Sequence, residues 1–249
     1  MGTSKKPGHV MLLALSLLVL TASADTKANK RTTRSLSRSE VKQAEQRLSE
    51  MGYGPGRVDG VFDGVTRNAL IAFQKMEGLK VTGRLGREDF DALGSASAPQ
   101  SKEAGYSHVE VDLDRQVLFL VDEDGLVKRV LPVSTGSNKQ YREKRMSGLA
   151  YTPRGRFRIY SKLSGWKRSP LGLLYYPNYF SGGVAIHGNP SVPSSPQSHG
   201  CIRIPMLAAA EISRLLPIGT IVLVYDKQSF VSAREWAEAD KLKQAADLR

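Results

Sequence analysis

The hydrophobic period of this chain changes once, and the change separates two kinds of fold. Before residue 95 the apolar residues recur with the 3.6-residue period of helices. After residue 105 they recur at every second position, which is typical of strands. The small, polar stretch at 95–105 has the composition of a linker. The sequence therefore predicts an α+β chain with two domains, a small all-α domain at 37–94 and a mainly-β domain at 106–226.

Three short helices account for the first domain. Ser37 and Glu40 form a capping box, the side-chain pattern that begins a helix, and Gly52 is placed to end it. A second helix has its apolar residues on one face within 65–76, and a third covers 87–93. A three-helix module of about 60 residues is near the lower size limit for a stable core.

The second domain is predicted to consist mainly of strands. Apolar residues at every second position place the strands at 109–113, 117–121, 127–133, 155–160, 184–187 and 220–225. A short helix is expected at 206–216. Residues 227–249 are rich in strong helix formers and contain a second capping box, so a C-terminal helix is predicted there.

The first 24 residues have the three parts of a secretory signal peptide. Lys5 and Lys6 precede an apolar core at 10–20, and Ala22-Ser23-Ala24 supplies small residues at the cleavage position. This core is too short to cross a bilayer, so no stable membrane span is expected after cleavage. Residues 25–36 are polar and basic and form the predicted flexible spacer. We therefore expect export to the periplasm or cell wall, with an uncleaved amphipathic anchor as the alternative.

Composition limits the chemistry that an exported chain of this kind can carry. The sequence has one cysteine, Cys201, and four histidines, so it forms no intrachain disulfide and has few ligands for a closed zinc site. The formal net charge is +12, and ten Lys or Arg against one acid lie in residues 139–168. This segment either attracts anionic wall polymers or is a solvated basic loop. Because no nucleic-acid-binding motif is present, nucleic acid is not an expected partner.

Residues of the predicted helical domain match a known pattern in register. The matching residues are Gln46-x-Leu48, Met51-Gly-Tyr53, Asp59-Gly60-x-Phe62-Asp63, Thr66-x-x-Ala69, Phe73-Gln74, Gly78-Leu79 and Thr82-Gly83. Through them residues 37–94 resemble a peptidoglycan-binding domain of the three-helix type. The resemblance implies non-catalytic attachment to wall polymer, and a generic three-helix interaction module is the alternative.

The β-rich region carries four motifs in order along the chain. They are Val133-Ser-Thr-Gly136, Thr152-Pro153-x-Gly155-x-Phe157-x-Ile159, Gly182-Gly-Val-Ala-Ile-His187-Gly188 and Ser198-His199-Gly200-Cys201-Ile-Arg203. Through them residues 106–226 resemble the catalytic domain of L,D-transpeptidases of the YkuD type. Many members of that family have a longer insertion between the last two motifs. Here the connection has prolines at 190, 193 and 196, which predict a stiff, extended segment instead of a mobile lid.

The resemblance implies that Cys201 is a nucleophile and that His187 is its base. A thiol reacts as the thiolate, and a neighbouring imidazole can accept its proton. The second nitrogen of His187 then needs an acceptor, for which a main-chain carbonyl at or near Gly188 is expected. An anionic intermediate needs hydrogen-bond donors, and the consecutive amides of His199, Gly200 and Cys201 are candidates for this oxyanion hole.

Other residues near the motifs are candidates for support or for substrate binding. Ser198 is expected to brace the loop by hydrogen bonds to the main chain, and His199 either props the turn or acts directly. Arg203 is a candidate for holding a substrate carboxylate or an internal acid. His108 lies outside every motif and is expected on the surface. The aromatic candidates for the walls of a substrate cleft are Trp166, Tyr176 and Tyr179.

The predicted function is that of an exported cysteine L,D-transpeptidase in wall biogenesis and cell shape, with peptidoglycan as substrate and partner and with no cofactor or metal. The resemblance implies release of a terminal D-amino acid, a thioester on Cys201 and transfer of the acyl group to an amine, giving a 3→3 cross-link. An L,D-carboxypeptidase that uses water as the acceptor is the first alternative. The others are a zinc hydrolase with His187, His199 and Cys201 as ligands, and a wall-binding protein without activity.

Overall fold

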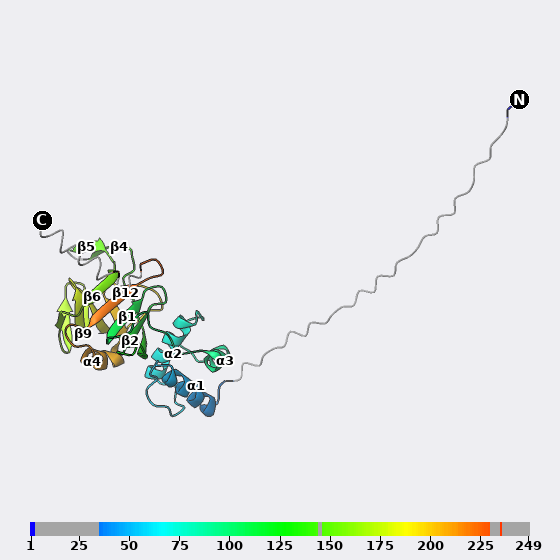
Figure 1. Cartoon of the computed structure of the whole chain (residues 1–249), viewed down its shortest axis with the longest axis horizontal. Coiled ribbons are helices and arrows are strands. Elements are labelled where there is room, and N and C mark those ends of the chain that lie inside the picture. Colours follow the sequence, from blue (N-terminus) through cyan, green and yellow to red (C-terminus); the bar gives the residue numbers. More distant parts are fainter. Residues whose placement is uncertain (3–34, 144–145, 230–234, 236–249) are drawn as a thin grey trace. The chain divides into compact units, whose positions relative to one another are not determined.

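Figure 1 shows the computed structural model of the chain, which describes residues 1–2, 35–143, 146–229 and 235. The predicted signal peptide, most of the spacer and most of the predicted C-terminal helix lie outside these residues. The described residues from Ser35 onward belong to one compact unit. Within the described ranges, no helix has the length and apolar composition needed to cross a membrane.

Three helices form the first part of this unit: α1 (Arg38–Glu50), α2 (Gly64–Met76) and α3 (Arg87–Ser95). The predicted capping box begins α1, because Ser37 Oγ accepts the amide of Glu40 while the Glu40 carboxylate accepts the Ser37 amide at 2.7 Å. Asp63 caps α2 by accepting the amides of Val65 and Thr66, the second and third residues of that helix. The apolar faces of the helices then enclose a core around Leu48 and Phe73.

Strands in two main sheets form most of the remainder. They are β1 (His108–Asp112), β2 (Val117–Val121), β3 (Val127–Pro132), β4 (Gln140–Glu143), β5 (Met146–Leu149), β6 (Gly155–Arg158), β7 (Ser161–Lys162), β8 (Trp166–Ser169), β9 (Gly172–Ser181), β10 (Val184–Asn189), β11 (Ile202–Pro205) and β12 (Ile221–Tyr225), with helix α4 (Met206–Leu215) before the last strand. The first sheet has the order β3-β2-β1-β12-β6. The second has the order β11-β10-β9-β7, with β8 paired to β9, and β4 and β5 form a separate hairpin. The predicted α+β class, a helical region followed by a mainly-β region, is confirmed.

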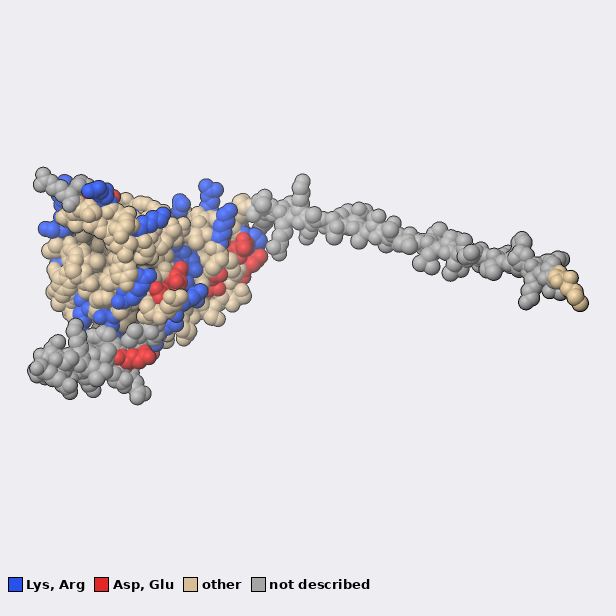
Figure 2. Space-filling model, turned by 90° about the horizontal axis from the view of Figure 1, so that it is seen from above, with Lys and Arg blue, Asp and Glu red and all other residues tan. Residues whose placement is uncertain are grey.

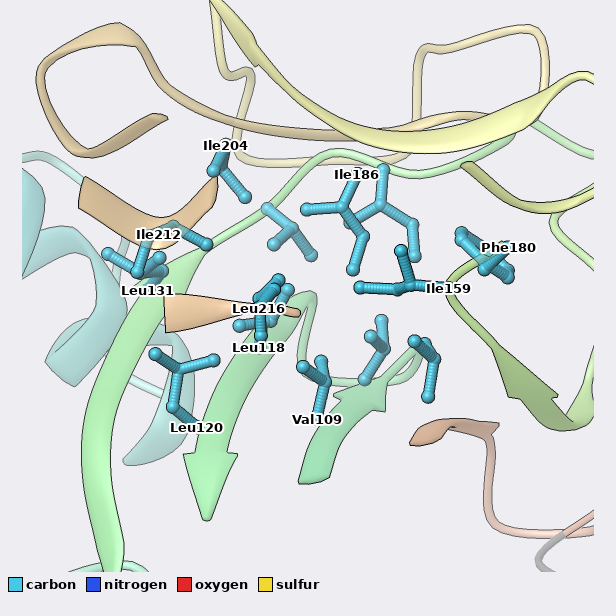
Figure 3. Close-up of a cluster of buried hydrophobic side chains, with 14 of the residues drawn as sticks. Val109, Leu118, Leu120, Leu131, Ile159, Phe180, Ile186, Ile204, Ile212 and Leu216 are labelled. Atoms are coloured by element: carbon cyan, nitrogen blue, oxygen red, sulfur yellow. The ribbon is translucent and has the colours of Figure 1, made fainter. Parts of the chain in front are cut away.

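The main core lies between the two sheets and α4 (Figure 3). Val109, Leu118 and Leu131 enter it from the first sheet, and Ile186 and Ile204 enter it from the second. Each fully buried aliphatic side chain of this size contributes about 1.5–3 kcal/mol to the free energy of unfolding. The core therefore holds β10 and β11, whose outer face carries the candidate site, firmly against the first sheet.

Strand β2 is buried on both faces, whereas the sequence analysis assigned it one apolar face. Leu118 and Leu120 face the main core, while Val117, Phe119 and Val121 pack with the helices. A strand covered on both sides appears in a sequence as a short continuous apolar run, which is what β2 is. The helical module, residues 37–95, therefore shares a core with the first sheet.

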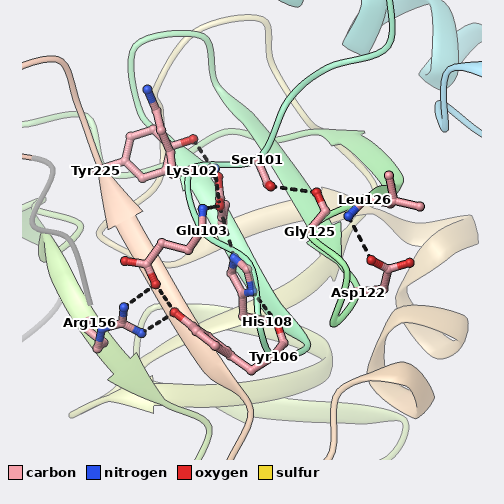
Figure 4. A network of polar contacts seen from close by, with 11 residues as sticks. Ser101, Lys102, Glu103, Tyr106, His108, Asp122, Gly125, Leu126, Arg156 and Tyr225 are labelled. Atoms are coloured by element: carbon pink, nitrogen blue, oxygen red, sulfur yellow. Dashed lines mark hydrogen bonds and ion pairs between the residues drawn. The ribbon is translucent and has the colours of Figure 1, made fainter. Parts of the chain in front are cut away.

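The second half of the predicted linker is held against the first sheet by a buried polar network (Figure 4). Arg156 forms an ion pair with Glu103. At the centre of the network, Glu110 accepts the hydroxyl of Tyr225 at 3.1 Å and lies 3.1 Å from Nε2 of His108. His108 is only 2% exposed, so its expected place on the surface is wrong. These contacts fix the connection between the helices and β1.

Candidate active site

The register of β10 and β11 places three of the predicted site residues on one face of the second sheet. The strands are parallel, with Ile186 paired to Ile202 and His187 paired to Arg203. Both isoleucines point into the main core. Because side chains alternate along a strand, His187 and Arg203 point the other way. Cys201, one residue before Ile202, shares this outward face with them.

A cleft of about 580 Å³ opens on this outward face. The predicted site residues that line it are Tyr179, His187, Ser198, His199, Gly200, Cys201 and Arg203. Further lining residues were not among the predicted site residues; they include Met146, Lys167, Arg168, Leu174 and Asn189. Lys167 and Arg168 belong to the basic segment at 139–168, which charge clustering marks as a candidate contact for anionic polymers. Leu174 and Asn189 have no such signal in the sequence.

Three of the predicted site residues do not line this cleft. Trp166 packs against the ring of Tyr175, with ring centroids 4.9 Å apart, and Tyr176 packs edge-on against the same ring at 4.7 Å. Gly188 is buried, and a Cβ there would lie 2.5 Å from Cβ of Ala209. The β9–β10 register shifts just before Gly188, and Tyr176 has a positive φ of 49°. This β-bulge changes the face to which the neighbouring side chains belong.

His187 is buried, at 2% exposure, and held in one orientation. Its Nδ1 lies 2.9 Å from the carbonyl oxygen of Gly188, which is the contact anticipated from the sequence. Because a carbonyl only accepts, Nδ1 carries the proton of the neutral ring and Nε2 keeps a free lone pair. Burial lowers the pKa of His187 to about 4. The positive charge of Arg203 also lowers this pKa, whereas the hydrogen bond to the Gly188 carbonyl raises it. The imidazole is therefore neutral at pH 7 and able to accept a proton.

Cys201 is partly exposed and lines the cleft. Burial raises the pKa of its thiol above the ordinary value, while the main-chain amide of Ala185 and the charge of Arg203 act in the opposite direction. Burial therefore favours the uncharged form of both the Cys201 thiol and the His187 imidazole. The thiol itself donates to the carbonyl oxygen of Gly183 at 3.8 Å.

Ser198 and Gly200 close the turn that leads into Cys201. Ser198 Oγ donates to the carbonyl oxygen of Cys201 at 2.6 Å and accepts the amide of Gly200 at 3.0 Å. From outside the turn, Thr152 Oγ1 donates to the carbonyl oxygen of Gly200 at 2.7 Å. Since the Gly200 amide is engaged with Ser198, the oxyanion candidates narrow from three amides to those of His199 and Cys201.

The loop is also held on both sides of the cysteine by an upstream segment, residues 134–137. Ser134 exchanges two main-chain hydrogen bonds with Arg203, each 3.1 Å long. Thr135 accepts the amide of Ser198 at 2.9 Å. The Val133–Gly136 motif therefore supports the loop that positions Cys201.

Replacing Gly200 by alanine tests how strictly this loop is defined. Gly200 has φ +141°, which favours glycine, and a Cβ there would lie 2.8 Å from the main-chain oxygen of Tyr151. We expect Gly200→Ala to slow alkylation of Cys201 by iodoacetamide by roughly 100-fold, because small displacements of a reactive group cost rate steeply. The matched control is Gly182→Ala, where φ is also positive but no atom of the described residues lies within 4 Å of the added Cβ. Equal rates for the two variants would contradict the expectation.

His199 turns toward the β4–β5 hairpin. Its Nε2 lies 3.0 Å from a carboxylate oxygen of Glu143, and its ring packs edge-on against Tyr141 with centroids 4.7 Å apart. These contacts join the hairpin to the Cys201 loop and favour the propping role of the side chain. The main-chain amide of His199, and not its side chain, is the candidate donor to the oxyanion.

The cleft is basic. Lys167, Arg168 and Arg203 line it, and none of the lining residues that the structure describes is acidic. Within the described ranges, no carboxylate forms an ion pair with Arg203. Figure 2 shows Lys and Arg interspersed with acidic side chains on the face in view. A cleft lined by cations without acids favours a substrate that carries negative charge.

The zinc hypothesis needs three ligands that converge. Among the residues that the structure describes, no three His, Cys, Asp or Glu side chains are grouped closely enough to hold a metal ion. His199 is turned toward Glu143, and Nδ1 of His187 is engaged with a carbonyl. The geometry therefore does not support His187, His199 and Cys201 as a ligand set.

Comparison with known proteins identifies both parts of the chain. A family model described as the L,D-transpeptidase catalytic domain (YkuD) matches residues 106–224, and a model of a peptidoglycan-binding domain matches residues 37–93. The chain is similar to the crystal structure of an L,D-transpeptidase from Xylanimonas cellulosilytica, with 38% identity and a TM-score of 0.69 over 75% of this chain and 93% of that one. For an L,D-transpeptidase from Stackebrandtia nassauensis the identity is 24% and the TM-score 0.46, over 74% and 90%. No protein among the curated sequences matches the chain.

Proposed function

Because the chain belongs to the L,D-transpeptidase family, we propose that it is an exported enzyme that cross-links peptidoglycan stem peptides through a cysteine acyl-enzyme. The observation that carries the proposal is the placement of Cys201 and a buried, neutral His187 on one face, in a basic cleft. The helical module, whose residues match a peptidoglycan-binding domain, holds the enzyme at its polymeric substrate. The signal-peptide pattern of residues 1–24 supports action in the periplasm or cell wall.

In the first half-reaction, Nε2 of His187 accepts the thiol proton while the sulfur of Cys201 bonds to the carbonyl carbon of the third stem residue. The amides of His199 and Cys201 donate to the oxyanion that forms. When the tetrahedral intermediate collapses, the C–N bond to the terminal D-alanine breaks and the imidazolium gives its proton to the leaving amine. The product is a thioester on Cys201 and a free D-amino acid.

In the second half-reaction, an amine of a neighbouring stem attacks the thioester carbonyl. His187 accepts the proton of this amine, and the oxyanion again forms between the same two amides. Collapse breaks the C–S bond, and the imidazolium returns its proton to the Cys201 sulfur. The new amide joins the third residues of two stems, which is a 3→3 cross-link, and the enzyme is regenerated.

The charged wall of the cleft is proposed to bind the carboxylates of the stem. Arg203 faces the same side as Cys201 and has no acidic partner among the described residues, so its guanidinium is available for a substrate carboxylate. Lys167 and Arg168 lie on the β8–β9 side of the same cleft. Tyr179 supplies an aromatic wall of the cleft near Cys201. Burial raises the pKa of Tyr179, and its interaction with Cys201 adds to this rise.

The acceptor in the second half-reaction is what separates cross-linking from hydrolysis. We expect the purified enzyme, incubated with a tetrapeptide stem, to release D-alanine and to give more 3→3 dimer than free tripeptide when the acceptor amine is present. Mass spectrometry of the products, with and without the amine, measures this ratio. Tripeptide as the sole product under both conditions would overturn the transpeptidase assignment in favour of an L,D-carboxypeptidase, while the acyl-enzyme mechanism would still stand.

A further inference from the structure

The helical module contacts the first sheet through a charged residue as well as through a shared core. Lys75, near the end of α2, is only 7% exposed at this contact. A buried ammonium group is unfavourable unless its donors are satisfied. The hydrogen-bond acceptors of the Lys75 ammonium group therefore identify the part of the first sheet that α2 holds.

Lys75 donates to two main-chain carbonyls of the catalytic domain. Its Nζ lies 2.7 Å from the oxygen of Val133 and 3.2 Å from the oxygen of Gln116. These two residues are themselves joined, because the Val133 amide donates to the Gln116 carbonyl at 2.9 Å. Val133 is the residue that leads into the 134–137 segment, which supports the Cys201 loop. One helix side chain thus secures the point from which that segment begins.

The Gln116 side chain extends this contact toward the site. Its Nε2 donates to Oγ1 of Thr135 at 2.8 Å, and its Oε1 accepts the Thr135 amide at 2.9 Å. Gln116 has φ +56°, which residues other than glycine adopt rarely, so its surroundings hold it in place. Thr135 accepts the amide of Ser198, and Ser198 closes the turn before Cys201. Direct hydrogen bonds therefore connect the helical module to the residue that closes this turn.

We propose that Lys75 is a positioning residue for the Cys201 loop, so that the helical module sets the geometry of the active site in addition to binding the wall. The inference rests on the proposed function, because acylation of Cys201 is its readout. Holding Val133 and Gln116 fixes Thr135, which in turn fixes the amide of Ser198. Loosening this support slows the attack of the sulfur without altering how a ligand enters the cleft.

The test uses the full chain and a carbapenem as the acylating probe. Lys75→Met keeps most of the side-chain volume and removes the ammonium donors, and Lys42→Met, at an exposed position of α1, is the matched control. The rate constant of Cys201 acylation at saturating carbapenem is expected to fall about tenfold in Lys75→Met, with the half-saturating concentration unchanged. The Lys42→Met variant is expected to match the wild type. The rate is measured at a temperature at which every variant is folded, so that a loss of stability alone does not change it.

A second variant keeps the proposal testable if Lys75→Met does not fold. Thr135→Val removes the hydroxyl that accepts from Gln116, and it is expected to slow acylation to a similar extent. If both variants fold, the double variant is expected to be no slower than the slower single variant, because both changes release the same support. Wild-type rates in the single variants, or independent multiplication of the two effects, would overturn the inference. Failure of the wild type itself to be acylated would instead refute the proposed function.

Discussion

Cys201→Ala is expected to abolish 3→3 cross-linking and D-alanine release from a tetrapeptide stem. The thiol is the group that forms the proposed acyl-enzyme, and among the described residues no other cysteine is present to replace it. Loss of a nucleophile of this kind lowers the rate by at least ~1,000-fold. The measurement is the amount of dimer and of free D-alanine formed per hour, determined by mass spectrometry.

The control for this variant is that it still folds and still binds the wall. Cys201 lies in the cleft and not in the main core, so the alanine variant is expected to keep the wild-type melting temperature within a few degrees. Its binding to purified peptidoglycan sacculi is expected to be unchanged, because that role is assigned to the helical module. Cross-linking at even a tenth of the wild-type rate by a folded variant would contradict the cysteine mechanism.

His187→Gln is expected to slow acylation of Cys201 by roughly 100- to 10,000-fold, the usual contribution of a general base. Since the pKa of His187 lies near 4, the wild-type rate is expected to persist below pH 6 and to fall only as the imidazole becomes protonated near pH 4. The pH–rate profile of acylation by a carbapenem measures this. A wild-type profile that falls at about pH 6.5, the ordinary value for histidine, would contradict the buried neutral base.

The same residue links stability to pH, and this gives an independent readout for His187→Gln. The folded-state pKa lies below the unfolded value, so between pH 6.5 and 4 the unfolded chain binds more protons than the folded one. The free energy of unfolding therefore decreases as the pH falls through this window, by up to roughly 3 kcal/mol. Urea unfolding at several pH values is expected to show this decrease in the wild type and a smaller one in His187→Gln.

The sequence was sufficient for the parts of the structure that depend on local pattern. Helical and strand periods identify the four described helices and six of the twelve described strands (β1, β2, β3, β6, β10 and β12), and the Ser37–Glu40 capping box marks where α1 begins. The burial of β2 on both faces could not be predicted in this way. It depends on the helical module covering Phe119 and its neighbours, which is a contact between segments far apart in the chain. The contact between Lys75 and Val133 likewise joins residues that lie 58 positions apart in the sequence, which a local pattern does not reveal.

Within the site, motif matching located the residues, but conformational detail decided what each does. The alternation of side chains along a strand explains why His187 and Cys201 share a face. The β-bulge before Gly188 has no clear sequence signal, and the aromatic ring of Tyr176 packs on Tyr175 outside the cleft. Periodicity likewise cannot show that the amide of Gly200 is engaged with a serine hydroxyl.

The most direct test of the account is intact-mass spectrometry of the purified protein after incubation with a carbapenem, beside the Cys201→Ala variant. Members of the family to which this chain belongs are expected to be acylated at the nucleophilic cysteine by such β-lactams. The account predicts a single covalent adduct with the mass of one carbapenem on the wild type and none on the variant. An unmodified wild type whose thiol also reacts slowly with iodoacetamide, or an adduct that persists in Cys201→Ala, would contradict the assignment of Cys201 as the activated nucleophile.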